Sequence, residues 1–147
     1  ALWLLAYPEI SSVSSQNFHH YTKSVEDTSI SCIKCNNSAV INMEVSWSLP
    51  VEKDHFFLEV YGTKGSFSIN PFRIYKKVEN DYINLTPTQV DNPTVLLKKS
   101  YLNELKSFIG AINGLNPVFS PGEEAMQRMK IIEAMYESAE KKHEIKL

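Results

Sequence analysis

The alternation of apolar and polar residues is clearest in residues 39–47. A period of two along the chain is typical of a β-strand that buries one of its faces. The polar residues Asn42 and Glu44 fall between the apolar positions and are expected on the opposite face. The apolar positions are Ala39, Ile41, Met43, Val45 and Trp47.

Residues 56–69 predict a β-hairpin. Both arms are rich in aromatic and β-branched residues, and Gly62 and Gly65 bracket the two-residue turn between them. If this hairpin pairs with the strand at 39–47, then Phe56, Leu58 and Val60 extend the apolar face. On that pairing the polar face, which is studded with aromatic side chains, consists of Asn42, Glu44, Phe57, Glu59 and Tyr61.

Further strands are predicted on both sides of these two segments. The two upstream segments and the strand at 39–47 are expected to form an antiparallel meander, because Asn36-Asn37 provides a turn. The additional strand segments are residues 9–21, 28–35, 72–76, 82–85 and 144–147.

The periodicity becomes helical from Ser100 onward. One apolar stripe ends before Gly114, and a longer helix is expected to open with a capping box at residues 120–123. Residues 1–6 have the character of a helix end, which indicates a chain cut from a longer one. The pattern therefore predicts an α+β fold, with an open, mostly antiparallel β-sheet and helices packed on one face.

Composition indicates one soluble domain spanning residues 1–147. The chain is 43% apolar and 22% charged, and 15 Lys and Arg residues nearly balance 17 Asp and Glu residues. Without a cluster of basic residues or a long apolar segment, neither a nucleic acid nor a membrane is expected as a partner.

The candidate chemistry within the chain is sparse. Cys32 and Cys35 form a C-x-x-C pair in a strand-like segment, where odd spacing sends the two sulfur atoms to opposite faces. Zinc would need His19 and His20 as further ligands, which makes a small metal-binding protein the third hypothesis. Two free thiols predict a cytoplasmic location. We expect no catalytic, cofactor-binding or metal-binding residue in the chain.

Several segments in this order resemble the C-terminal domain of the glucose–fructose oxidoreductase / inositol dehydrogenase / rhizopine catabolism (Gfo/Idh/MocA) family. The two most specific are an E-x-x-G-x-x-G motif at residues 59–65 and an I-I-E-A-x-Y-x-S-A motif at residues 131–139. The others are Val25-Glu26-Asp27, the strand ending at Trp47, and residues 101–108.

The resemblance implies one domain of an NAD- or NADP-dependent dehydrogenase of sugars, cyclitols or related polyols. The nucleotide-binding domain and a D-x-G-x-H segment with the catalytic pair would precede residue 1, so residues 1–147 alone are expected to be inactive. Lys53, Asp54 and His55 occupy the loop expected to face the substrate, although a plain surface loop is an open alternative.

The resemblance also implies self-association into a homodimer or tetramer through the open sheet face. That face carries Asn42, Glu44, Phe57, Glu59 and Tyr61. The alternative function is a free-standing binding or dimerisation module of the same fold without catalysis.

Overall fold

A computed structural model describes residues 1–89 and 91–147 of the chain. The chain divides into two compact units, which are described separately. Unit 1 combines Ala1–Pro50 with Pro117–Leu147, and unit 2 is Val51–Asn116. The α+β fold class predicted from the sequence is confirmed, because two helices accompany two four-stranded antiparallel sheets.

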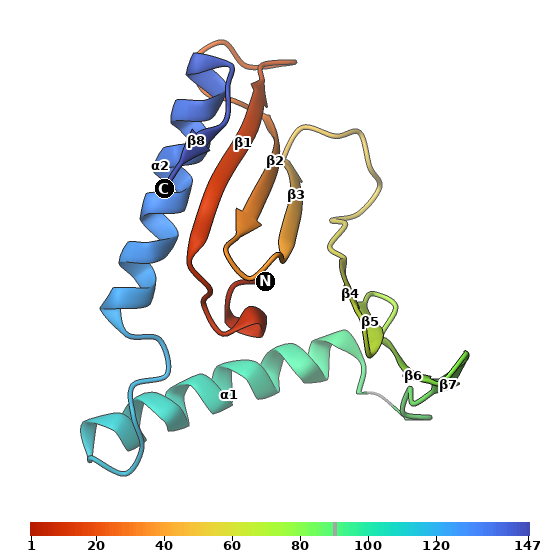
Figure 1. Ribbon diagram of the computed structural model, residues 1–147. Coiled ribbons are helices and arrows are strands. Elements are labelled where there is room, and N and C mark those ends of the chain that lie inside the picture. The colour runs from red at the N-terminus through yellow and green to blue at the C-terminus, as the bar shows by residue number, and fades with distance from the viewer. Residues whose placement is uncertain (90) are drawn as a thin grey trace. The chain divides into compact units, whose positions relative to one another are not determined.

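Unit 1 contains sheet A, in the strand order β3-β2-β1-β8 (Figure 1). The first three strands form the predicted antiparallel meander, and β8 pairs with the other side of β1. The elements of this unit are η1 (Trp3–Leu5), β1 (Ile10–Phe18), β2 (Thr28–Cys35), β3 (Val40–Ser46), α2 (Gly122–Lys141) and β8 (Ile145–Lys146).

The core of unit 1 lies between α2 and sheet A. Burial of these side chains is the main source of its stability, because apolar surface leaves water there. Ser138 joins the two layers as well: its hydroxyl accepts from the amide of Ser15 at 3.0 Å and donates to the carbonyl of His143 at 2.8 Å. The buried apolar residues are Ile10, Val13, Ile33, Cys35, Ile131, Ala134 and Met135.

The alternation predicted for β3 is confirmed. Ile41 and Met43 are partly buried against the core, whereas Asn42 and Glu44 are exposed on the outer face. Val45 shares the inner face but keeps 54% of its surface exposed. The inner face of the sheet is therefore covered only in part.

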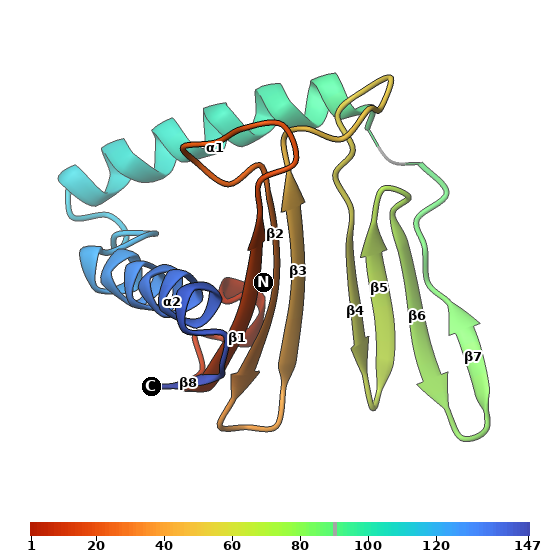
Figure 2. The same cartoon turned by 90° about the horizontal axis from the view of Figure 1, so that it is seen from above.

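Unit 2 contains sheet B, whose strand order β4-β5-β6-β7 can be followed in Figure 2. The predicted hairpin is present, with Gly62 opposite Gly65. Gly65 has φ +155°, and a Cβ there would lie 2.2 Å from the carbonyl oxygen of Tyr75, so only glycine fits. The elements are β4 (Leu58–Gly62), β5 (Gly65–Ile69), β6 (Arg73–Val78), β7 (Asp81–Asn84) and α1 (Pro93–Ile112).

The pairing expected between the strand at 39–47 and the hairpin is wrong. In the structure β3 pairs with β2, and the hairpin pairs with β6 in a different sheet. A period of two specifies which side chains share a face, but it does not specify the neighbouring strand.

Two helix starts also differ from the sequence prediction. α1 begins at Pro93 rather than near Ser100, and Asn92 caps it by accepting from the amide of Val95 at 3.0 Å. The capping box expected at residues 120–123 does not form: Pro121 is the N-cap of α2, and the hydroxyl of Ser120 accepts from Arg128 at 3.3 Å.

The apolar stripe of α1 is exposed in this chain. Leu105, Ile109 and Ile112 keep 59%, 56% and 70% of their surface accessible. The sequence predicted that this stripe would be buried against the sheet. Within the described residues, neither helix is long and apolar enough to cross a bilayer.

Candidate functional site

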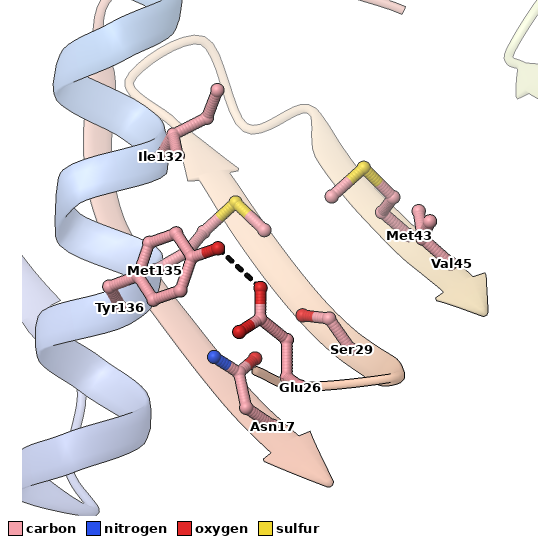
Figure 3. Close-up of a pocket in the computed structure, with 8 residues that line it drawn as sticks. All are labelled: Asn17, Glu26, Ser29, Met43, Val45, Ile132, Met135 and Tyr136. Carbon is pink, nitrogen blue, oxygen red and sulfur yellow. Dashed lines mark hydrogen bonds between the residues drawn. The ribbon is translucent and has the colours of Figure 1, made fainter. Parts of the chain in front are cut away.

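A pocket of about 180 Å³ lies between α2 and the inner face of sheet A in unit 1 (Figure 3). Its walls combine apolar side chains from α2 and β3 with polar side chains from β1, β2 and the loop before β2. The lining residues are Asn17, Glu26, Ser29, Met43, Val45, Ile132, Met135 and Tyr136.

A hydrogen bond from the Tyr136 hydroxyl to Glu26 Oε1 closes one side of this pocket (Figure 3). The bond stabilises the carboxylate, so it lowers the pKa of Glu26 and raises the pKa of Tyr136. Glu26 is therefore ionised and Tyr136 protonated near neutral pH. This pair can accept and donate hydrogen bonds, but neither group is poised to exchange a proton near pH 7.

The loop that carries Glu26 is held by its neighbour, Asp27, which is 1% exposed. Asp27 Oδ2 accepts from the amides of Tyr21 at 2.7 Å and Thr22 at 3.2 Å. Burial acts to raise the pKa of Asp27, but backbone amide donors from Tyr21, His20 and Thr22 outweigh it and lower the pKa to about 2. An ionised Asp27 thus fixes the loop at one end of the pocket.

Replacing Asp27 by asparagine should destabilise the chain and weaken the pH dependence of its stability. The folded-state pKa of about 2 lies below the ordinary 3.8, so the carboxylate stabilises the fold above that value. This contribution is lost as pH falls from about 4 towards about 2. Thermal unfolding followed by circular dichroism should show that, between about pH 4 and about pH 2, the melting temperature of the wild type falls more steeply than that of Asp27→Asn.

The matched control for this experiment is Asp81→Asn, at an exposed position in β7. It should leave both the melting temperature and its pH dependence close to those of the wild type. Equal pH profiles for the wild type and Asp27→Asn would contradict the role given to the Asp27 carboxylate.

The chemical capacity of this pocket alone is small. Ligand sites usually enclose roughly 300–1,000 Å³, so a cavity of about 180 Å³ is less than a sugar site needs. Across residues 1–89 and 91–147, no group of three or more His, Cys, Asp or Glu side chains is arranged to hold a metal ion. The pocket can contribute contacts to a larger site but does not form a complete active site.

The residues predicted to face substrate lie in unit 2. Lys53, Asp54 and His55 are all exposed in the loop that precedes β4. The His55 ring packs on Phe57 with centroids 5.4 Å apart, and Asn70 Nδ2 donates to the carbonyl of Phe56 at 2.9 Å. The loop is thus tied to β4 and β5, and its role towards a substrate stays a prediction.

The residues predicted to form an oligomer interface are all exposed, but they come from both sheets. Asn42 and Glu44 are on sheet A, whereas Phe57, Glu59 and Tyr61 precede or belong to β4. Tyr61 donates to Glu59 Oε2 at 3.1 Å, which raises the pKa of Tyr61. The interface itself stays a prediction.

The C-x-x-C pair has the geometry predicted for it. Cys35 is buried in the core, where desolvation raises the pKa of its thiol, while Cys32 is on the outer face opposite Asn42. His19 Nδ1 lies 3.0 Å from the carbonyl of Val25, and His20 stacks on Phe18. The two sulfur atoms are therefore on opposite sides of the sheet, which excludes their joint coordination of one zinc ion in this fold.

Sequence reasoning did not identify Glu26 and Tyr136 as a pair. Both occur in the segments that carry the family resemblance, but they are 110 residues apart. Tyr136 recurs at helical spacing with the apolar residues Met129, Ile132 and Ala139, which is the pattern of an apolar stripe. A tyrosine in such a stripe still needs a partner for its hydroxyl, and that requirement was the available signal.

Comparison with known proteins gives a consistent result over the whole chain. Residues 1–147 match the family model of the "Oxidoreductase family, C-terminal alpha/beta domain". D-glucoside 3-dehydrogenase of Escherichia coli (strain K12) is 20% identical over 156 residues, which cover 95% of this chain and 43% of that protein.

Two solved structures share the fold. The WlbA dehydrogenase of Bordetella pertussis, in complex with NADH and UDP-GlcNAcA, matches with a TM-score of 0.75 and 19% identity over 99% of this chain and 44% of its own. The aldose-aldose oxidoreductase of Caulobacter crescentus, complexed with glycerol, matches with a TM-score of 0.71 and 18% identity over 97% of this chain and 43% of its own. The chain thus spans less than half the length of these relatives.

Proposed function

This chain belongs to the Gfo/Idh/MocA oxidoreductase family, whose C-terminal alpha/beta domain it matches, and we propose that it is the substrate-side domain of an NAD-dependent dehydrogenase of sugars or related polyols. The observation that carries this proposal is the family match over all 147 residues. Among the similar proteins, a D-glucoside 3-dehydrogenase and a dehydrogenase in complex with NADH and UDP-GlcNAcA support the choice of substrate class and cofactor.

Two features of the described helices support a cofactor site outside residues 1–147. A pyrophosphate binds where a glycine-rich loop leads into the free amides of a helix N-terminus. In α1 the Asn92 side chain already accepts from one of these amides. In α2 the first turn carries Glu123 and Glu124, whose charges repel a phosphate. On this proposal the cofactor is held by polypeptide outside residues 1–147.

The proposed contribution of this chain is to bind and orient the substrate. The loop with Lys53, Asp54 and His55 offers one carboxylate and two groups that donate hydrogen bonds, which are suited to sugar hydroxyls. Hydride transfer also requires a cofactor and a proton acceptor held against the reacting carbon. The domain alone is therefore expected to be inactive.

A calorimetric titration with NAD⁺ and NADH tests this division of roles. Residues 1–147 should give no saturable binding, whereas the full-length protein that contains them should bind the cofactor and reduce NAD⁺ in the presence of a glycoside or polyol. Saturable binding to residues 1–147 in the micromolar range would contradict the proposal. An inactive full-length protein that fails to bind either nucleotide would favour a free-standing binding module.

A further inference from the structure

One end of sheet A brings together three segments of unit 1. β1 ends at Phe18, β2 begins at Thr28 and β3 ends at Ser46, and the antiparallel register pairs Phe18 with Thr28 and Thr28 with Ser46. The loop of residues 19–27 and the residues that follow β3 therefore leave the sheet at the same end (Figure 1). Side chains from both segments can thus contact the same ligand.

Aromatic and hydrogen-bonding side chains gather at this end of the sheet. Tyr21 is 75% exposed and Trp47 is 66% exposed, and the exposed ring of His20 stacks on Phe18 with the two ring planes 5° apart. A single exposed aromatic side chain is ordinary on a protein surface. Several rings beside groups that form hydrogen bonds are typical of small-molecule sites, which combine apolar contact with a few polar groups.

Two hydrogen bonds to main-chain carbonyls fix Trp47 at this position. Its indole N–H donates to the carbonyl of Glu26 at 3.2 Å, and its amide donates to the carbonyl of Asp27 at 3.2 Å. The Glu26 side chain in turn accepts from the Tyr136 hydroxyl on α2. Because the one polar atom of the indole is already paired, the exposed surface of the ring is apolar, and it is held in place before any ligand binds. Such preorganisation reduces the entropy cost of binding.

The segment that follows Trp47 leads to the loop that we propose binds the substrate. Lys53, Asp54 and His55 come directly after residues 48–52. The polar groups of these three side chains are suited to the hydroxyl groups of a sugar. Trp47 offers the complementary contact, because its ring can cover the carbon atoms of the same molecule.

A sugar ring has two kinds of surface. Its hydroxyl groups form hydrogen bonds, and the C–H groups between them form an apolar face that matches the flat face of an indole. An open-chain polyol has no such rigid face. We propose that Trp47 is the residue on which the ring of a pyranose or cyclitol substrate stacks, and that it favours cyclic substrates over open-chain polyols. This inference rests on the proposed function and narrows its substrate class.

Steady-state kinetics of the full-length protein test this role of Trp47. The variants Trp47→Phe and Trp47→Leu both lose the indole N–H that binds the Glu26 carbonyl, but only phenylalanine keeps an aromatic face. With NAD⁺ and the best substrate among the methyl pyranosides of glucose, galactose and mannose, Trp47→Leu should raise KM about tenfold and leave kcat nearly unchanged. Trp47→Phe should keep KM within about threefold of the wild-type value. Any oxidation of sorbitol should keep its wild-type KM in both variants.

Trp3→Leu is the matched control, because Trp3 is 60% exposed but its ring lies against Phe119, with centroids 6.1 Å apart. It should leave KM unchanged, and circular dichroism establishes that each variant is folded. The inference alone would be overturned by an unchanged KM in Trp47→Leu, by equal increases in Trp47→Leu and Trp47→Phe, or by a wild type that oxidises sorbitol but no pyranoside. A wild type that reduces NAD⁺ with neither class of compound would contradict the proposed function, and this inference with it.

Discussion

Alanine at position 131 should lower the free energy of unfolding by about 2–5 kcal/mol, because it removes a buried aliphatic side chain and leaves a cavity. Ile131 is 4% exposed and lies on α2 in the core cluster of unit 1. The cavity would lie between the helix and sheet A, where the surrounding backbone hydrogen bonds limit collapse. Urea denaturation of residues 1–147, followed by circular dichroism, measures the change.

The adjacent residue provides a matched control. Ile132 has the same side chain on the same helix but is 39% exposed and lines the pocket. Ile132→Ala should lower the free energy of unfolding by less than about 1 kcal/mol, because the side-chain atoms that it removes are already partly in water. Similar losses for the two variants would contradict the orientation of α2 on the sheet.

The sequence specified the faces of the strands but not their partners. The alternation at residues 39–47 correctly assigned Ile41 and Met43 to the core side and Asn42 and Glu44 to the outer side. It could not show that β3 pairs with β2 alone and that the hairpin pairs with β6. Face assignment follows from local burial, whereas strand pairing depends on contacts between distant segments.

The sequence was also a limited guide to where the two helices begin. Asn92 followed by Pro93 is a strong helix-start signal, and the Asn92 side chain caps α1, whereas the apolar periodicity predicted a helix only from Ser100 onward. Ser120 is of a residue type that often caps helices, but its hydroxyl accepts a hydrogen bond from Arg128. A capping motif competes with tertiary hydrogen bonds, and a sequence alone does not show which one forms.

The candidate site depended most on tertiary structure. Glu26 and Tyr136 lie on different elements, and only the packing of α2 near sheet A joins them. A pair assembled across the fold has no local sequence signature, so the sequence alone could not identify it.

The other large effect that we expect is the loss of self-association when the exposed face of sheet B is changed, because we propose this face as the surface through which the protein associates. Tyr61 is 78% exposed and Phe57 is 57% exposed. Glu59, Tyr61, Arg73 and Tyr75 line a shallow depression on this face. In a dimer with two-fold symmetry, a residue of one subunit contacts a different residue of the other subunit. A face that carries both Glu59 and Arg73 can therefore pair with a second copy of itself.

Charges placed on this face should separate the subunits. Phe57→Lys combined with Tyr61→Glu removes two aromatic anchors and leaves unpaired charges in the interface, and the new carboxylate would lie beside Glu59. An unpaired buried charge costs about 3–5 kcal/mol, which is more than a hundredfold in a dissociation constant. Light scattering at micromolar concentration should give a dimer or larger assembly for the wild type and a folded monomer for the double variant.

The control for this experiment changes the same number and kind of charges elsewhere. Met126→Lys with Met129→Glu alters two side chains on α2 that are 62% and 55% exposed, and should leave the measured mass unchanged. Circular dichroism of both double variants establishes that each is folded. A wild type that is monomeric, or a Phe57→Lys, Tyr61→Glu variant that stays associated, would show that this face is in contact with solvent and that assembly, if any, uses another surface.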